Sequence, residues 1–382
     1  MNRAGYYVQQ PSGYRAFIPN NLPPDPPIKV DQEMWYLLSQ ADRAVGRLDG
    51  STETLPNPDL FVFMYVRKEA VLSSQIEGTQ ASLLDVIEYE AKALRLGKSD
   101  DVEEVINYVA AMNHGLDRLK ELPVSLRLIR EIHGKLLQGV RGSERSPGEF
   151  RRTQNWIGSG GGSISEASFV PPPPNELIKS LGDLEKFIHS KSPMPILQKV
   201  GLTHAQFETI HPFLDGNGRV GRLLITFLLC EQGVLTRPLL YLSHYFKRHR
   251  TKYYDLLQAI RDTGDWESWL KFFLRGVFEV SQEATATARE IVTLRERHRQ
   301  MITGVLGAST AKALALLENL YWNPIVSVHH VTDVTQLAYA NANRLVEKMV
   351  DMNILQEITG RKRDRRFAYD SYLKLFSEDS SA

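Results

Sequence analysis

The sequence predicts a mainly α-helical protein that carries one small β-hairpin and ends in a separate helical module with two short strands. Three observations support this fold class. Apolar residues recur at helical spacing through most of the chain, in segments bounded by capping residues and glycines. Between residues 141 and 174 this pattern gives way to β-prone pieces around a run of glycine and serine. After about residue 303 the character of the chain changes again.

The N-terminal part is predicted to begin with an arm and to continue as helices. Residues 1–30 are rich in proline, so we expect an extended arm without a regular element. Helices are predicted over 31–50, 59–77, 80–96, 101–119 and 125–138. Asp59 is expected to cap the second of them, and Gly78 to end it.

The middle of the chain is predicted to hold the hairpin and further helices. Segments 150–157 and 169–170 flank the glycine–serine run, which is typical of a hairpin with a mobile tip, although an ordinary surface loop shares this composition. Asn175 is expected to cap the next helix, and helices follow over 195–210 and 218–232. The long helices after Asp265 have the length to pair in a homodimer, but no heptad pattern supports this.

The C-terminal segment from 303 to 382 resembles a winged helix-turn-helix. Helices over 310–321, 328–335 and 339–353 precede two strands, 354–358 and 365–369, that form the wing. DNA would be contacted through residues 339–366, by the polar and basic side chains Asn341, Asn343, Arg344, Lys348, Arg361, Lys362, Arg363, Arg365 and Arg366. An interaction or dimer module without DNA fits equally well, because the rest of the chain carries no basic excess.

Composition excludes several classes of protein. The 382 residues have a net charge of +1, which gives no general attraction to nucleic acid or membranes. The single cysteine, Cys230, allows no disulfide within the chain and lies in an apolar run, as a core thiol does. There is no apolar signal core and no stretch that would span a bilayer, so we expect a cytoplasmic protein.

The most informative segment is HPFLDGNGRVGR, residues 211–222. Its glycines allow close approach of a ligand, and the helix that begins near Gly218 offers free amide groups to an anion. Arg219 and Arg222 lie on one face of that helix and suit phosphate oxygens. Asp215 is an oxygen ligand suited to Mg²⁺, and His211 is a base at neutral pH. Each residue alone has an ordinary structural explanation, but together they indicate nucleotide chemistry.

These twelve residues resemble the signature of the Fic (Fido) family at every fixed position, without a departure. A second match lies upstream, where Ser73-Ser74-Gln75-Ile76-Glu77-Gly78 resembles the inhibitory-helix motif of Fic proteins. The resemblance implies the subclass in which an N-terminal inhibitory helix belongs to the same chain. It also implies five regions: an arm (1–30), a helical region with the inhibitory helix (31–122), the Fido domain (123–275), a linking helix (276–302) and a winged-helix-like domain (303–382).

The resemblance implies a protein adenylyltransferase that moves AMP from ATP, with Mg²⁺, to a Tyr, Ser or Thr hydroxyl of a target protein or of itself. His211 would be the catalytic base and Asp215 the metal ligand, while Glu77, supported by Ser73, would inhibit by pairing with Arg222. The protein target would dock on the hairpin, which acts as a flap over the nucleotide. The expected nucleotide-binding residues are Phe213, Asp215, Gly216, Asn217, Gly218, Arg219, Val220, Gly221, Arg222, Ile157, Gly158 and one of Tyr253 and Tyr254.

Two other functions remain open at this point. Some relatives transfer other phosphate-containing groups, or remove AMP with the inhibitory glutamate activating water, and Glu77 permits that reaction. A DNA-binding regulator that acts through its C-terminal domain belongs to a different class, and it is compatible with either chemistry.

Overall fold

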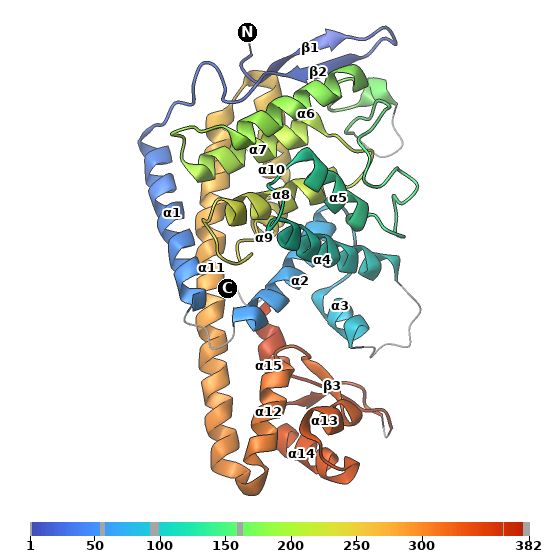
Figure 1. The fold of residues 1–382 in the computed structure, drawn as a ribbon, viewed down its shortest axis with the longest axis vertical. Helices are drawn as coiled ribbons and strands as arrows, with labels where there is room; N and C mark the ends of the chain where they lie inside the picture. Colours follow the sequence, from blue (N-terminus) through green and yellow to red (C-terminus); the bar gives the residue numbers. More distant parts are fainter. Residues whose placement is uncertain (1, 54–57, 92–98, 159–162, 362, 377–382) are drawn as a thin grey trace.

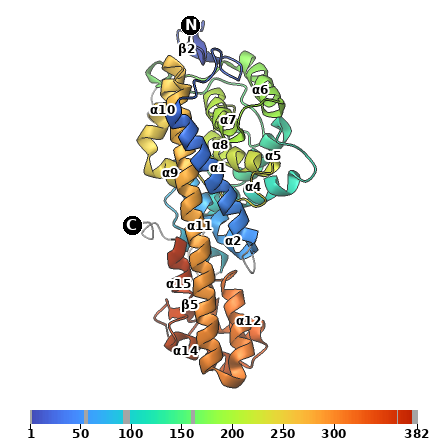
Figure 2. The same ribbon diagram turned by 90° about the vertical axis from the view of Figure 1, so that its left-hand side faces the viewer.

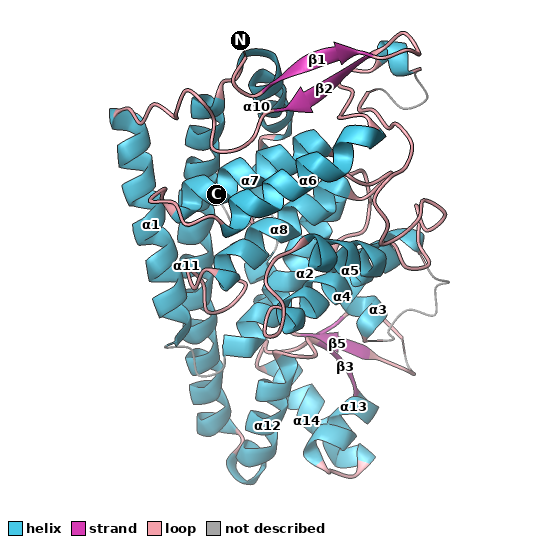
Figure 3. Ribbon diagram, turned by 45° about the horizontal axis from the view of Figure 1, so that its top comes forward, coloured by secondary structure: helices cyan, strands magenta, loops and turns pink. Residues whose placement is uncertain are grey.

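The computed structural model describes residues 2–53, 58–91, 99–158, 163–361 and 363–376. The molecule is elongated and almost entirely helical (Figure 1). One helix of 40 residues, α11 (Trp266–Val305), runs along most of its length. The strands form one two-stranded and one three-stranded sheet, which are separated by helices (Figure 3).

The N-terminal arm is not without regular structure, contrary to the prediction. Strands β1 (Gly5–Gln9) and β2 (Arg15–Pro19) pair antiparallel, and Gly13 turns between them with φ +89°. Pro11 lies in the turn between the strands and the other prolines of the arm lie at or after the end of β2, while the strands themselves contain aromatic and β-branched residues. The hairpin is tied to the core because Phe17 is buried and its N–H donates to the Val170 carbonyl (2.9 Å).

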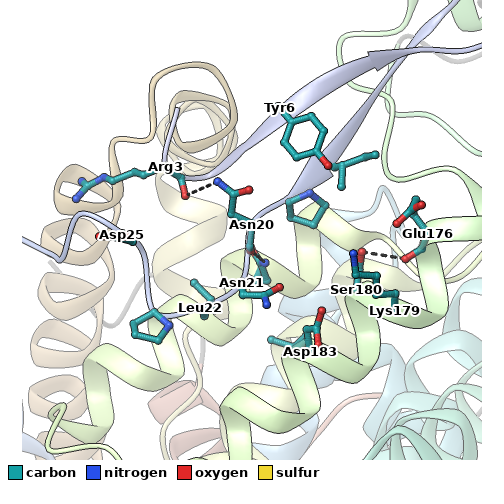
Figure 4. A pocket seen from close by; sticks show the side chains of 15 residues that line it. Arg3, Tyr6, Asn20, Asn21, Leu22, Asp25, Glu176, Lys179, Ser180 and Asp183 are labelled. Atoms are coloured by element: carbon teal, nitrogen blue, oxygen red, sulfur yellow. Dashed lines mark hydrogen bonds between the residues drawn. The ribbon is translucent and has the colours of Figure 1, made fainter. Parts of the chain in front are cut away.

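The remainder of the arm packs over helix α6 (Pro174–His189) and leaves a polar cavity of about 490 Å³ (Figure 4). Its walls are held by bonds within the protein: Arg3 Nε donates to the Gly264 carbonyl (2.9 Å), and Asn20 Nδ2 donates to the Arg3 carbonyl (3.3 Å). Gln206 Nε2 in turn donates to the Asn20 carbonyl (2.8 Å). The arm is therefore anchored to the same helical body that carries residues 195–210.

The predicted N-terminal helices are present with shifted ends. They are α1 (Gln32–Glu53), α2 (Pro58–Ile76), α3 (Leu83–Glu90), α4 (Asp100–Arg118) and α5 (Leu126–Leu136). Asp59 lies inside the first turn of α2 rather than at its cap, because Pro58 occupies the first helical position. Helix α3 begins later than predicted because Ser82 and Asp85 form a capping box. Residues 92–96 of that prediction lie outside the described residues.

Helix α1 packs along the first half of α11, as Figure 2 shows from the side. Met34 and Ala41 of α1 are completely buried, as are Trp269 and Phe273 of α11. Over this length the apolar face of α11 is covered by a helix of the same chain.

The hairpin between 141 and 174 is smaller than predicted. Its two sides meet in a single antiparallel bridge, in which Ile157 and Phe169 exchange both backbone hydrogen bonds (2.8 and 3.1 Å). A short 3₁₀ turn, η1 (Ile164–Glu166), follows the predicted tip, of which residues 159–162 lie outside the described residues. The next helix, α6, begins with Pro174, so Asn175 is its second residue and not its cap.

The helical body is completed by α7 (Ile196–Ile210), α8 (Asn217–Glu231), α9 (Ser243–Arg248) and α10 (Arg250–Thr263). Helices α7 and α8 pack against each other, and nearly every residue of both is buried. Burial on all sides explains why the apolar residues of α8 are not confined to one stripe, and why the polar residues of α7, such as His204 and Glu208, are buried as well. None of the helices in the described part of the chain combines the length and apolarity needed to cross a membrane.

Helix α11 continues without a break through residues 275–276, where the boundary between the Fido domain and the linking helix was predicted. The C-terminal module follows after the end of α11. Its elements are α12 (Thr310–Leu320), β3 (Ile325–Ser327), α13 (Val328–Thr335), α14 (Tyr339–Asp351), β4 (Gln356–Glu357) and β5 (Arg366–Ala368), then α15 (Asp370–Leu373) and the 3₁₀ turn η3 (Lys374–Phe376). Strands β4 and β5 pair as predicted, and β3 adds an unpredicted third strand to give the order β3-β5-β4. The buried contact between His298 Nδ1 and the Tyr369 hydroxyl (2.8 Å) joins α11 to this module.

Candidate active site

The backbone of the loop between α7 and α8 is left-handed at two positions, a conformation that few residue types adopt readily. His211 ends α7 with left-handed angles (φ 50°, ψ 61°), and Gly216 is also left-handed (φ 75°) directly before α8. The chain therefore turns sharply at both ends of the loop and directs the first amide groups of α8 to the same side. The predicted start of this helix at Gly218 is confirmed to within one residue.

Buried side chains hold the loop in this shape. Phe213 is completely buried and stacks on His133, with ring centroids 3.7 Å apart and planes 6° apart. The Nε2 atom of His133 bonds to the Asp215 carbonyl (3.1 Å), while its Nδ1 accepts from the Gly148 N–H (2.8 Å). Burial lowers the pKa of His133 to about 4, so this histidine is neutral and structural, as predicted.

Asn217, which was predicted to contact the nucleotide, also has bonds within the loop. Its side chain is buried and is used within the loop, where Oδ1 accepts from the Phe213 N–H (2.8 Å) and Nδ2 donates to the Phe213 carbonyl (2.9 Å). The carboxamide thus shapes the loop. What Asn217 can offer an anion is its backbone N–H at the start of α8.

Two residues of the hairpin base, which the sequence did not single out, clamp the loop from the other side. Arg151 Nε donates to the His211 carbonyl (2.9 Å), and its backbone N–H donates to the Pro212 carbonyl (2.9 Å). Asn155 Nδ2 donates to the carbonyls of His211 (3.2 Å) and Phe213 (2.7 Å). The hairpin and the loop are therefore one hydrogen-bonded unit, joined next to the candidate base.

His211 itself is held as a neutral imidazole. Burial and the nearby charges of Arg261 and Arg151 lower the pKa of His211 to about 3. Its Nδ1 atom is buried and has no hydrogen-bond partner among the described residues. An unprotonated ring beside the N-terminus of a helix has the properties of a base that can take a proton from a bound hydroxyl.

Arg222 is held by the predicted inhibitory motif. Its side chain is 2% exposed, and Nη2 contacts Glu77 Oε1 at 2.7 Å. The same guanidinium donates to the Ser73 hydroxyl (2.7 Å) and to the Ser73 carbonyl (2.9 Å). Ser73 and Glu77 were expected to share one face of a helix, and both reach Arg222 from the end of α2.

The Glu77 carboxylate lies over the start of α8. A side-chain carbon at Gly218 would overlap Glu77 Oε1, so this position accepts only glycine while Glu77 is in place. Burial tends to raise the pKa of Glu77, but Arg222, with Arg219 and His211, outweighs it and holds this pKa below its usual range. The same carboxylate raises the pKa of Arg222, against the effect of burial. An anion is thus already present where the helix N-terminus would attract one.

Arg219 faces a carboxylate that the sequence did not predict. Its side chain is 2% exposed, and Nη1 lies 3.5 Å from Oε2 of Glu104, which is equally buried on α4. Glu104 also accepts from the Thr79 hydroxyl (2.8 Å), just beyond the inhibitory motif. A buried arginine requires a compensating charge, and this requirement, rather than any local motif, explains why the Glu104 carboxylate lies beside Arg219.

Asp215 is suited to a metal. Its side chain is 29% exposed, Oδ1 accepts from the Gly216 N–H (2.6 Å), and Oδ2 lies 3.8 Å from Arg145 Nη1. The described residues contain no cluster of three or more carboxylate, histidine or cysteine ligands. A single accessible carboxylate beside an anion site fits Mg²⁺, which commonly takes one or two protein oxygens and completes its shell with phosphates and water.

Comparison with known proteins agrees with this geometry. The family model described as Fic/DOC family N-terminal matches residues 35–117, and the Fic/DOC family model matches residues 123–229. These two segments of the chain belong to the Fic/DOC family. The second match contains the whole 211–222 loop, and the first contains the Ser73–Glu77 motif.

Curated relatives in this family are named protein adenylyltransferase Fic. The chain is 30% identical to the one from Aedes aegypti over 249 residues, which are 64% of this chain and 46% of that protein. It is 33% identical to the one from Culex quinquefasciatus over 203 residues, which are 52% of this chain and 37% of that protein. The chain thus spans less than half the length of these curated relatives.

Solved structures confirm the Fic-type fold. A Fic family protein from Desulfovibrio desulfuricans G20 matches with a TM-score of 0.61 and 20% identity, over 90% of this chain and 97% of that one. A Fic domain containing signaling protein from Bacteroides thetaiotaomicron matches with a TM-score of 0.52 and 17% identity, over 66% of this chain and 97% of that one. At these identities the similarity concerns the fold alone.

The remaining predicted site residues divide into those near the Fic loop and those in the core. Val220 is buried, and Gly221 faces α7, where a side chain would overlap the Glu208 carboxylate, so both serve packing. Tyr253 is 1% exposed and its hydroxyl bonds to His204 Nε2 (2.9 Å), which makes it a core residue. Of the two tyrosines, Tyr254 is the accessible one, at 38% exposure. Ile157 and Gly158 lie on the hairpin as predicted.

Proposed function

We propose that this protein transfers AMP from ATP to a hydroxyl side chain of a protein, and that Glu77 inhibits this reaction in the same chain. The observation that carries the proposal is the combination of a neutral, half-buried His211 with an anion-binding helix start whose arginine is held by Glu77. The names of the curated relatives support the same reaction.

The reaction needs a base, an anion site and charge compensation. His211 takes the proton from the target hydroxyl as its oxygen attacks the α-phosphorus of ATP. The new bond forms between that oxygen and the α-phosphorus, while the bond from the α-phosphorus to the β-phosphate bridging oxygen breaks and pyrophosphate leaves. Amides at the start of α8 receive the phosphates, and Arg219 and Arg222 compensate their charge. Asp215 would hold Mg²⁺, which offsets the charge on the phosphates when it is bound.

Inhibition follows from competition for Arg222. While Glu77 pairs with this guanidinium and lies over Gly218, the γ-phosphate of ATP lacks its partner and meets a like charge. ATP would then bind weakly or with the α-phosphorus turned away from His211. Displacement of Glu77 would restore both the arginine and the helix N-terminus.

The target is expected to add to the free edge of the hairpin as an extended segment. Ile157 uses both of its backbone groups on Phe169, and Val170 is bonded to Phe17 of β2, so that side of the hairpin is already covered. On the other side, Trp156 is 42% exposed beside Gly158. Backbone pairing along this edge would hold a target hydroxyl near His211 without a strict sequence rule.

The test is incubation with Mg²⁺ and ATP labelled on the α-phosphate, followed by intact mass and peptide mapping. Wild type, Glu77→Gly and His211→Ala are compared, with Glu279→Gln as a control that removes an equivalent charge from the surface of α11. We expect AMP on the protein, more of it in the Glu77 variant, and none in the His211 variant. Equal labelling of all four proteins would refute the proposal. It would also be refuted if a folded Glu77→Gly protein transferred no AMP, either to itself or to other proteins added to the reaction.

A second candidate function is DNA binding through the C-terminal module, proposed here as a winged helix. Asn341, Arg344 and Lys348 are exposed on α14, and Arg361 and Arg363 are exposed between β4 and β5. Lys362 lies outside the described residues, and Arg365 is partly engaged with Asn343 Oδ1 (2.9 Å). A gel shift that weakens with salt, and further with Arg361→Ala and Arg363→Ala, would support this function. Absence of a shift at low salt would reject it.

A further inference from the structure

A buried guanidinium with no part in the proposed chemistry lies beside the end of α7. Arg261 of α10 is 5% exposed, and within the described residues its side chain donates to uncharged groups. Nε donates to the Thr209 hydroxyl (3.4 Å), and Nη2 donates to the Glu208 carbonyl (3.2 Å). Burial lowers the pKa of Arg261 to about 10, so the group still carries its charge at neutral pH. A charge removed from water is costly unless its surroundings compensate it.

The first compensating group is the C-terminus of α7. The last carbonyls of a helix lack partners within the helix and carry a partial negative charge. Arg261 bonds to the carbonyl of Glu208 in the last turn. Arg151 bonds to the carbonyls of Ile210 (3.4 Å) and His211 (2.9 Å). Two buried arginines from different elements thus hold the turn that ends at His211, whose left-handed angles persist only where the surroundings fix them.

The second compensating group belongs to the hairpin. The guanidinium carbon of Arg261 lies over the Phe169 ring, 3.9 Å from its centre, where a cation is attracted. Phe169 is 2% exposed and forms the bridge with Ile157 through both of its backbone groups. The N-terminal arm supports this contact from two sides. Asn2 Nδ2 donates to the Arg261 carbonyl (2.6 Å), and the ring of Phe17 lies 5.9 Å from that of Phe169. One side chain therefore contacts both the last turn of α7 and the hairpin.

We propose that Arg261 is a positioning residue for AMP transfer, which fixes the hairpin at Phe169 relative to His211. The inference rests on the proposed function, because it concerns the alignment of the hairpin that receives the target with the base that takes its proton. Reacting atoms must approach within about 3–3.5 Å, and a displacement of about 1 Å lowers a rate about a hundredfold. Among the described residues, the Arg261 guanidinium contacts α7, α10 and the hairpin and not the start of α8, so ATP binding should not depend on it.

The test measures the rate of autolabelling against ATP concentration in the Glu77→Gly background. Arg261→Met removes the charge, and Arg261→Lys keeps it without the planar group that stacks on Phe169. Arg295→Met is the control, because the Arg295 side chain is also largely buried (16% exposed) but pairs with Glu318 of α12. We expect the maximal rate of Arg261→Met to fall at least about tenfold and that of Arg261→Lys to fall less, while the half-saturating ATP concentration changes by less than about twofold. The control should match its parent.

Action through the hairpin is tested with Phe169→Leu, alone and combined with Arg261→Met. The single variant should also lose maximal rate at unchanged ATP dependence, and the double variant should be no slower than the slower single variant, within about twofold. Phe169→Leu alone decides the matter if Arg261→Met does not fold. The inference is overturned if the folded variants keep the maximal rate of their parent, or if the two losses of rate simply multiply. It is equally overturned if the half-saturating ATP concentration rises as much as the rate falls, because Arg261 would then support the site as a whole.

A readout without transfer separates this inference from the proposed function. Amide hydrogen exchange is followed by mass spectrometry at Ile157 and Phe169, whose N–H groups form the bridge of the hairpin. Exchange there should be at least about tenfold faster in Arg261→Met than in wild type or in Arg295→Met. Unchanged exchange would overturn the link between Arg261 and the hairpin, whatever the labelling shows. If Glu77→Gly is not labelled at all, the proposed function fails, while the exchange result still decides whether Arg261 fixes the hairpin.

Discussion

Removal of Glu77 should increase the affinity for ATP by an amount that the contacts of Arg222 predict. The guanidinium makes one charge-assisted contact with Glu77 (2.7 Å) and two further bonds with Ser73. ATP must displace the first of these to reach the arginine. A hydrogen bond to a charged group contributes about 1.5–3 kcal/mol. Since 1.4 kcal/mol corresponds to a factor of ten, Glu77→Gly should bind ATP about 10- to 150-fold more tightly. Glu77→Gln keeps the shape without the charge and should give a smaller increase.

The assay is calorimetric titration of ATP and Mg²⁺ into proteins that also carry His211→Ala, so that no transfer occurs during the measurement. Glu279→Gln in the same background controls for the change in net charge. Without nucleotide the Glu77 variants should unfold at lower temperature, because Arg222 is buried and loses a partner. Bound ATP should raise their unfolding temperature more than it raises that of the parent. An ATP affinity that is equal in the parent and the Glu77→Gly protein would refute competition for Arg222.

Two further predictions concern residues that the structure brought to the site. Asn155→Ala removes two bonds to the loop carbonyls at His211 and Phe213, so we expect a loss of about 1–3 kcal/mol in unfolding free energy and a fall in kcat of autolabelling rather than a rise in KM for ATP. A kcat equal to that of the parent would contradict this positioning role. Glu208→Gln tests a buried carboxyl whose pKa burial raises to about 7 from an ordinary 4.5. The folded protein keeps this proton while the unfolded chain loses it, so the unfolding free energy of wild type relative to the variant should fall by about 3 kcal/mol as pH rises from 4.5 to 7.5. A difference that stays constant with pH would show that Glu208 is not held protonated.

Much of the fold could be predicted because helix signals are local. Apolar spacing, caps and glycine stops placed α1, α2, α4, α5, α7 and α8 within a few residues of their observed ends. The errors also have local causes. The prolines near residue 25 obscured the β-prone residues of β1 and β2, and Pro174 rather than Asn175 begins α6. Among the described residues, the hairpin at 157 and 169 is a single bridge, which is held in place by backbone bonds to β2 and to the loop between α7 and α8.

The sequence by itself determined the chemistry of the loop. His211, Asp215, Arg219 and Arg222 are close in the chain, and a sharp turn followed by a helix places them together in any fold that contains the segment. Ser73 and Glu77 also come together through local geometry, because they are four residues apart, about one helical turn. Only the tertiary structure decided which groups these residues meet. Glu104 reaches Arg219 across 115 positions, Arg151 and Asn155 reach the loop from the hairpin, and Tyr253 is withdrawn into the core. Such partners follow from burial, because a charge or carbonyl removed from water must be compensated by whatever group the packing places beside it.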